Sequence, residues 1–535
     1  MAMTTSRFAP ILALAAACAP AGSQWSITLV SASEEDPFAS ATDIQVSLCS
    51  NECNDCRPVE SFQRADGSGT LGELGYDSYR VEVRLLDGQE NIVGYGGSAC
   101  YRFAGEDRQT TISVGKAGAF FTARKESGDD VALEFGLAGM SATSLEGGRV
   151  LLAGGAEIDS DGKLTSIHAE AFLYDPDTGG LDPAPSMSTP RAWHTATTLK
   201  RNASGVKRVL LAGGLTIGGN SVQATPTADV FDPGDETFQA ADGAMREPRF
   251  GHAAAALLSS EVLLVGGGQV AAGAELPIAL GDLSVTASRT ADEFTPLGRS
   301  GQFGAVDGNM VEARMWPTAT ALGEDVAIIG GAGDDGSPAE DETVERYHAG
   351  PMVFCPGQNP EERPACPDPD AAGSFDVVEN GGVRERYGHA AALLGAAGAE
   401  IVVAGGIGAN GSAMTSVEIY TLETIPAPVG SRTLREPRAF PTMISIDADR
   451  FLVVGGHDSG VPQDTAEIWS PSTGESGGLI NLAAGGRLWH AMAKLDNQMI
   501  LIAGGATSPD GKGGWTGQTS IELYVPDGDA LRSGD

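Results

Sequence analysis

The chain has 535 residues, of which 41% are hydrophobic and 73 are glycine, so it is long enough for more than one domain and too apolar to be disordered as a whole. Its 71 acidic and 34 basic residues give a net charge of −37. This charge excludes nucleic acid as an expected partner, because binding phosphates requires clustered Lys and Arg.

Residues 1–18 are predicted to be a lipoprotein-type signal peptide. Arg7 precedes an apolar run from Phe8 to Ala17 that is too short to cross a bilayer. Residues 14–18 resemble a bacterial lipobox, although the leucine stands four residues before the cysteine instead of three. The resemblance implies lipid attachment at Cys18 and an anchored location in the cell envelope, periplasmic or at the outer-membrane surface. The alternative is an ordinary signal peptide cleaved near Ala21; both predict export.

The region before the repeats is predicted to contain a small β-sandwich. Residues 19–40 are expected to be a tether that includes a first strand at 25–30. Within 41–123, apolar and polar side chains alternate over 43–48, 79–86, 91–97 and 110–114, as in half-buried strands. Residues 75–97 resemble immunoglobulin-like or prealbumin-like modules of exported bacterial proteins. The resemblance implies a spacer or a binding module.

Six cysteines follow the signal, and in an exported chain they are disulfide candidates. They are Cys49, Cys53, Cys56, Cys100, Cys355 and Cys366. Cys355 and Cys366 are expected to pair with each other, and two bonds are expected among the other four with the pairing left open. The alternative is a zinc site in which the Cys49–Cys56 cluster joins Cys100.

A short apolar run that ends in two glycines occurs seven times, from Arg149-Val-Leu-Leu-Ala-Gly-Gly155 onward. The glycine pairs are Gly154 and Gly155, Gly213 and Gly214, Gly266 and Gly267, Gly330 and Gly331, Gly405 and Gly406, Gly455 and Gly456, and Gly504 and Gly505. Because the pairs recur about every 50 residues, with insertions, the sequence predicts stacked or radially arranged units.

Each unit has the same order of parts. A run of small residues precedes the apolar run, an acid-aliphatic-aromatic strand follows a variable loop, and a more polar strand ends the unit. Four antiparallel strands per unit make a propeller blade, so residues 124–535 are predicted to form an all-β, seven-bladed propeller. Residues 247–268 and 384–406 resemble the kelch repeat in their "PR…GH" and "RERYGH" openings and their glycine pairs. Residues 130–135 are expected to supply the last outer strand.

Two kinds of polar residue recur in register with the repeat. An arginine precedes the innermost strand in six units, and in four of these a histidine follows three positions later. They are Arg191, Arg249, Arg314, Arg386, Arg438 and Arg487, and His194, His252, His389 and His490. Repetition favours a structural role, in which each arginine pairs with the acid of an aromatic strand and ties the blades together. The alternative is contact with an anionic ligand at the channel mouth.

The sequence favours a binding function over a catalytic one. Seven similar blades without a unique catalytic cluster predict a non-catalytic scaffold that presents its loops to a protein or glycan partner. The kelch resemblance implies an alternative, a carbohydrate-active enzyme at the channel mouth that is galactose oxidase-like or sialic acid mutarotase-like. No cysteine lies on an inner strand, which disfavours an oxidase-type copper site. Calcium is the one cofactor left open, because residues 157–168 superficially resemble an EF-hand loop.

Overall fold

The computed structural model describes residues 25–31, 36–50, 53, 55–63, 78–102, 108–125, 127–202, 204–306, 308–323, 325–339, 344–349, 352–354, 365–367, 373–378, 384–394, 400–421, 432–508, 514–528 and 531. Nearly all regular structure in these residues is β, apart from two 3₁₀ turns, η1 (Pro37–Ala39) and η2 (Leu280–Asp282). None of the described helices has the length and hydropathy to span a bilayer. Cys18 and Cys355, and the side chain of Cys366, lie outside the described residues.

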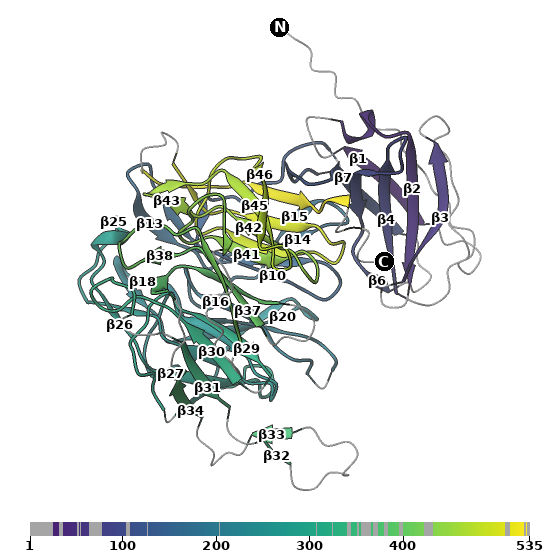
Figure 1. The fold of residues 1–535 in the computed structure, drawn as a ribbon. Helices are drawn as coiled ribbons and strands as arrows, with labels where there is room; N and C mark the ends of the chain where they lie inside the picture. The colour runs from purple at the N-terminus through teal and green to yellow at the C-terminus, as the bar shows by residue number, and fades with distance from the viewer. Residues whose placement is uncertain are drawn as a thin grey trace.

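The N-terminal region forms one sheet of seven strands, which lies at the side of the larger ring of blades (Figure 1). Its strands are β1 (Trp25–Ser31), β2 (Asp43–Ser50), β3 (Asp55–Gln63), β4 (Ser78–Leu86), β5 (Ile92–Gly97), β6 (Tyr101–Arg102) and β7 (Arg108–Lys116). Strand β7 pairs in parallel with β1 and only at its end with β5. Side chains from both parts, including Leu29, Val83 and Ile112, share one core. The β1–β7 pair and strands β2, β4 and β5 therefore enclose one shared core.

Seven of the four-stranded antiparallel sheets in the rest of the described chain form the blades. From the centre outward, the first four blades are β10 (Ser141–Ser144), β11 (Val150–Ala153), β14 (Ala171–Asp175) and β15 (Gly180–Ala184); β16 (Thr195–Thr198), β17 (Val209–Ala212), β20 (Ala228–Asp232) and β21 (Thr237–Ala240); β22 (Ala253–Ala256), β23 (Val262–Val265), β27 (Ala291–Thr295) and β28 (Gln302–Ala305); and β29 (Thr318–Leu322), β30 (Asp325–Ile329), β31 (Val344–His348) and β34 (Ser374–Val377).

The last three blades are β36 (Ala390–Leu394), β37 (Glu400–Ala404), β39 (Ser416–Thr421) and β40 (Arg432–Thr433); β41 (Thr442–Ser445), β42 (Phe451–Val454), β45 (Thr465–Ser470) and β46 (Glu475–Asn481); and β47 (Ala491–Lys494), β48 (Ile500–Ala503), β51 (Ile521–Val525) and β8 (Ala119–Thr122). Each innermost strand contacts those of the blades on either side, and β47 contacts β10. The blades therefore close into the predicted propeller ring.

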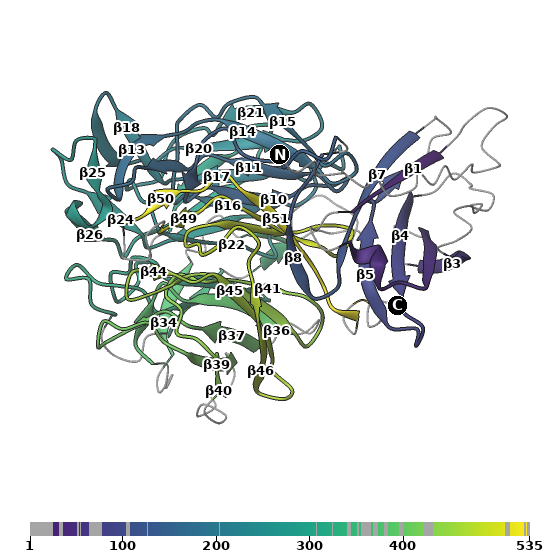
Figure 2. The same ribbon diagram turned by 90° about the horizontal axis from the view of Figure 1, so that it is seen from above.

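The strand that closes the ring is β8, not residues 130–135. Thr122 pairs with Glu522 and Ala119 with Val525, so the N-terminal part of the chain supplies the outer strand of the last blade (Figure 2). Both segments are short and apolar, so their composition did not distinguish them. β8 directly follows β7 of the N-terminal sheet, which places the end of the predicted sandwich segment inside the propeller.

Short strands outside the blades lie at one face of the ring, in one four-stranded sheet and several two-stranded sheets. They are β9 (Leu137–Ala138), β12 (Ala156–Ile158), β13 (Lys163–Ile167), β18 (Leu215–Gly218), β19 (Ser221–Ala224), β24 (Gly268–Val270), β25 (Ile278–Ala279), β26 (Val285–Ala287), β35 (Arg386–Tyr387), β38 (Ile407–Gly408), β43 (His457–Asp458), β44 (Val461–Pro462), β49 (Ala506–Thr507) and β50 (Thr516–Gly517). A further hairpin, β32 (Met352–Phe354) with β33 (Ala365–Pro367), lies in the insertion of the fourth blade.

The glycine pairs form the junctions between neighbouring blades. The amide of the second glycine donates to a carbonyl that belongs to the next blade, as from Gly155 to Arg191 (2.7 Å). A Cβ atom on the first glycine, Gly154, would lie 2.3 Å from the same carbonyl oxygen. Both glycines have positive φ angles, 65° and 108°, which L side chains rarely adopt. The repeated motif is therefore required by the ring geometry.

The N-terminal sheet docks firmly on the propeller through two turns. In the last blade, Asn497 donates to the carbonyl of Gly97 (2.7 Å) and accepts, at its own carbonyl, the hydroxyl of Tyr95 (3.0 Å). In the first blade, Asp177 accepts the amides of Ala99 (2.7 Å) and Thr111 (2.6 Å). These groups are buried, and such bonds are expected to hold the two parts in a fixed relation.

Candidate functional site

The six repeated arginines are enclosed within the blades. Each lies at 0% or 1% exposure, and each pairs with the acid on the third strand of its own blade, as Arg249 does with Asp292 (2.7 Å). The guanidinium of Arg249 also donates to the carbonyls of Gly266 (2.7 Å) and Thr290 (2.9 Å). The arginines therefore hold each blade together from within, and they present no surface to a ligand at the channel mouth.

The four repeated histidines connect blades instead of facing a ligand. Each Nε2 atom bonds a hydroxyl on the innermost strand of the preceding blade, as His389 does with Thr318 (2.8 Å) and His490 with Thr442 (2.6 Å). Burial, followed by the charge of the nearby arginine, lowers the pKa of His194, His389 and His490 to about 3. These imidazoles are therefore neutral near pH 7, and their ring nitrogens are directed into the blades.

The first blade departs from this pattern. Leu137 stands where the other blades carry arginine, and the repeat acid Glu170 is exposed. His168, which is only 8% exposed, contacts Glu157 through Nε2 (2.7 Å) and Glu170 through Nδ1 (3.1 Å). An imidazole between two carboxylates takes the place of the missing guanidinium. The 157–168 segment is a hairpin of β12 and β13, so the resemblance to an EF-hand loop has no structural counterpart.

One end of the ring carries packed aromatic side chains. Trp193, Trp316, Phe440 and Trp489 occupy equivalent positions in four blades, all with positive φ between 51° and 58°. Ring centroids lie 5.5 Å apart for Trp193 and Trp489 and 5.4 Å apart for Trp316 and Phe440. A glycine occupies this position in the other three blades, and a Cβ at Gly139 would lie 2.7 Å from the Trp193 ring. The aromatic side chains at this end of the propeller therefore pack against one another and against glycines, and we assign them a structural role.

The opposite end of the ring opens into a cleft of about 1000 Å³ beneath the N-terminal sheet. Ser144, Thr198 and Lys494, the last residues of three neighbouring innermost strands, lie on the propeller side. The complete lining is Cys53, Ser78, Arg80, Cys100, Ser144, Leu145, Glu146, Gly147, Thr198, Arg201, Lys207, Val209, Lys494, Leu495, Asp496 and Gln498. We call this the interdomain cleft, and it is the candidate site.

Two ionisable groups in the interdomain cleft have perturbed pKa values. Burial raises the pKa of Asp496, an effect that Arg80 and Lys207 oppose. Burial lowers the pKa of Lys494, whose ammonium donates to the carbonyl of Ile446 (2.6 Å). Groups in a cleft whose pKa values are shifted by burial are typical of functional sites. Both residues belong to the last blade, and Lys494 stands where the first two blades carry Ser144 and Thr198.

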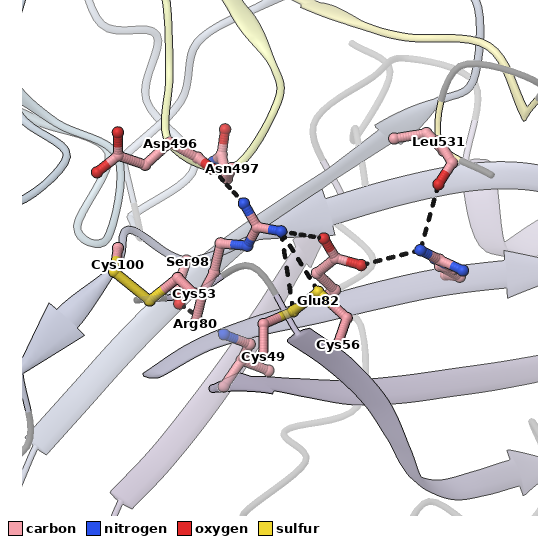
Figure 3. The surroundings of a disulfide bond; sticks show 12 residues. Cys49, Cys53, Cys56, Arg80, Glu82, Ser98, Cys100, Asp496, Asn497 and Leu531 are labelled. Atoms are coloured by element: carbon pink, nitrogen blue, oxygen red, sulfur yellow. Dashed lines mark hydrogen bonds and ion pairs between the residues drawn. A yellow bond between two sulfur atoms is a disulfide. The ribbon is translucent and has the colours of Figure 1, made fainter. Parts of the chain in front are cut away.

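Disulfides fix the other wall of the interdomain cleft (Figure 3). Cys49 bonds Cys56 and Cys53 bonds Cys100, which settles the pairing that the sequence left open. Arg80 lies between this wall and the propeller, because it donates to Glu82 (2.6 Å) and to the backbone carbonyl of Asp496. These two disulfides indicate an oxidising, extracellular environment.

The cysteine cluster does not fit a zinc site. Within the described residues, the one group of three His, Cys, Asp or Glu side chains close enough to share an ion is Cys49, Cys56 and Glu82. Its two sulfur atoms are bonded to each other, so no thiolate is available there. The zinc alternative for the cysteine cluster is therefore wrong.

Comparison with known proteins shows the fold alone. No protein-family model and no curated protein sequence matches the chain. Among solved structures, a fungal alcohol oxidase of the AA5 family, determined in complex with copper, aligns with a TM-score of 0.50 at 14% identity and covers 74% of this chain and 75% of its own. The structure of YjhT aligns with a TM-score of 0.40 at 11% identity and covers 73% and 98%. The likeness to the oxidase supports the β-propeller fold.

The sequence pattern favoured a structural role for the repeated arginines and histidines, with ligand contact only as the alternative. The structure buries the six arginines inside the blades, and the four histidines bond neighbouring blades. The interdomain cleft instead uses residues that break the repeat, such as Lys207, Lys494 and Asp496. The signal that could have found Thr198 and Lys494 is a polar side chain at the last position of an innermost strand, where the third blade has Ala256.

Proposed function

We propose that this protein is an exported binding protein whose interdomain cleft holds an extended polar ligand, a glycan or a segment of another protein. The cleft carries the proposal: it is large, lined by hydroxyl, amide and charged groups, and bounded by a disulfide-stapled sheet that is bonded to the propeller. Because the walls of the cleft are already rigid, little conformational entropy is lost when a ligand binds. Attachment to a membrane through lipid on Cys18 belongs to the same proposal and rests on the sequence pattern.

A variant that fills the cleft tests this function. Thr198 is exposed at the end of β16, so Thr198→Trp adds bulk to the cleft without disturbing a core. Gln239→Trp, on the exposed outer strand β21 of the same blade, is the matched control. A glycan and peptide array is expected to give ligands that bind the wild type and Gln239→Trp but not Thr198→Trp. Equal binding by all three proteins would contradict the proposed site.

The second candidate function is a carbohydrate-active enzyme at the same cleft. The raised pKa of Asp496 favours it, because burial makes this carboxyl group hold its proton to a higher pH than usual, and a general acid must hold the proton that it donates. The fold likeness to an alcohol oxidase shows that such a ring can support catalysis in another protein. Mass spectrometry of glycans incubated with the wild type and with Asp496→Asn tests this function. Product that forms with the wild type alone would favour the enzyme.

A further inference from the structure

The interdomain cleft has an unusual charge for this molecule. Four of its lining residues are cationic, Arg80, Arg201, Lys207 and Lys494, and two are acidic, Glu146 and Asp496. The whole chain carries more than twice as many acidic as basic residues, 71 against 34. A cleft of one predominant sign concentrates ligands of the opposite sign. The net charge of the whole chain, −37, otherwise disfavours binding of an anion.

The cations are placed to meet a ligand. The side chains of Arg201 and Lys207 are 60% and 45% exposed, and both share a single carboxylate, that of Glu146 (2.6 and 3.7 Å). Because one carboxylate faces two cationic side chains, the rim of the cleft keeps a net positive charge. Deeper in the cleft, the partly buried ammonium of Lys494 donates to the carbonyl of Ile446. An ammonium group has three donors, so donor capacity remains for a ligand.

The uncharged lining indicates which kind of anion fits. Ser78, Ser144, Thr198 and Gln498 supply hydroxyl and amide groups, which can bond the hydroxyls of a sugar. None of the lining residues is aromatic, so the stacking that favours neutral sugars and aromatic peptide side chains is missing. The few apolar lining groups, such as Leu145, make no apolar pocket for peptide anchors.

We infer that the ligand of the interdomain cleft is an acidic oligosaccharide, whose anionic groups lie against Lys494, Arg201 and Lys207 while its hydroxyls bond the polar wall. This inference rests on the proposed binding function. It adds the chemical class of the ligand.

Isothermal titration calorimetry of the full chain tests the inference with four probes of equal length: an oligogalacturonate, a sulfated oligosaccharide, a neutral oligosaccharide and an oligoglutamate peptide. We expect one or both acidic sugars to bind at least about tenfold more tightly than the neutral sugar and the peptide. Raising the salt from about 50 to 300 mM should weaken binding, because partly exposed charges are screened. The two acidic arms show whether carboxylate or sulfate is preferred.

Charge variants sharpen the test. Arg201→Gln and Lys207→Gln should each weaken acidic-sugar binding by about three- to fivefold, the range of one exposed ion pair, whereas Asp496→Asn should strengthen it. Arg299→Gln is the matched control, because Arg299 is 63% exposed and pairs with Asp235 elsewhere on the ring.

The outcomes separate the two proposals. Tight binding of a neutral sugar or of the peptide that Thr198→Trp abolishes would overturn the acidic-sugar inference and leave the proposed function standing. Binding of an acidic sugar that survives Thr198→Trp and is unaffected by the charge variants would overturn both the site and the inference. Binding of no probe would overturn the acidic-sugar inference, and the array experiment would then decide the proposed function separately.

Discussion

The arginine of each repeat is bonded so completely that its loss should be costly. In Arg249→Leu, the carboxylate of Asp292 and the carbonyls of Gly266 and Thr290 would lose their buried donor. Breaking a buried pair in this way costs about 3–5 kcal/mol. We expect a decrease of that size in the free energy of unfolding, measured by urea denaturation.

Two further variants control this prediction. Arg299→Gln removes an exposed pair and should cost no more than about 1 kcal/mol. The double variant Arg249→Leu/Asp292→Leu should recover part of the loss, since it leaves no buried charge unpaired. Equal destabilisation by Arg249→Leu and Arg299→Gln would show that the buried pair does not support the blade.

The buried histidines should make stability depend on pH. The pKa of His389 is about 3 in the folded protein against 6.5 for an ordinary histidine, so between these values the unfolded chain binds a proton that the folded chain does not. The histidine's contribution is therefore present above about pH 6.5 and is lost as the pH falls toward 3. Each such group adds a slope of about 1.4 kcal/mol per pH unit between pH 4 and 6. His389→Gln should reduce the measured slope by that amount, and an unchanged slope would contradict the assignment.

At the scale of the element, the glycine pair sets how closely two blades approach. A Cβ on Gly330 would lie 2.3 Å from the carbonyl oxygen of Arg386 in the next blade, at a φ of 61°. Gly336 has a similar φ of 74° but no atom within 4 Å of the added Cβ. Gly330→Ala should therefore destabilise the protein by at least about 2 kcal/mol more than Gly336→Ala, since only the first adds a clash to the backbone strain. Thermal denaturation of the two variants measures the difference.

Blade-level features could be predicted from sequence and the cleft could not, for a physical reason. The glycine pairs and the apolar runs appear in all seven blades and the arginine–acid pairs in six, because each junction requires the same packing, so repetition reveals them. The interdomain cleft is formed once, from Arg80 in the N-terminal sheet, Lys207 in the second blade and Asp496 in the last. Residues so far apart in the chain meet only through the docking of the sheet, which no local pattern encodes.

At the scale of the whole molecule, the N-terminal region and the propeller share structure. Ile92 and Tyr95 of β5 belong to the same apolar cluster as Leu501 and Leu523 of the last blade. The same chain segment then continues into β8, which covers the edge of β51. The two parts are therefore expected to unfold together, because neither can separate without exposing apolar surface and unpaired strand groups.

Two truncated chains would test how the ring depends on β8. Residues 117–535 retain β8, whereas residues 124–535 match the predicted propeller segment and lack it. Without β8, the amides and carbonyls of β51 and the buried ring of Tyr524 face solvent at an open sheet edge, which favours association between chains. The longer chain should melt at a higher temperature by differential scanning calorimetry and stay monomeric in sedimentation velocity, while the shorter one aggregates. Equal melting temperatures and equal solubility would mean that the ring closes without the N-terminal strand.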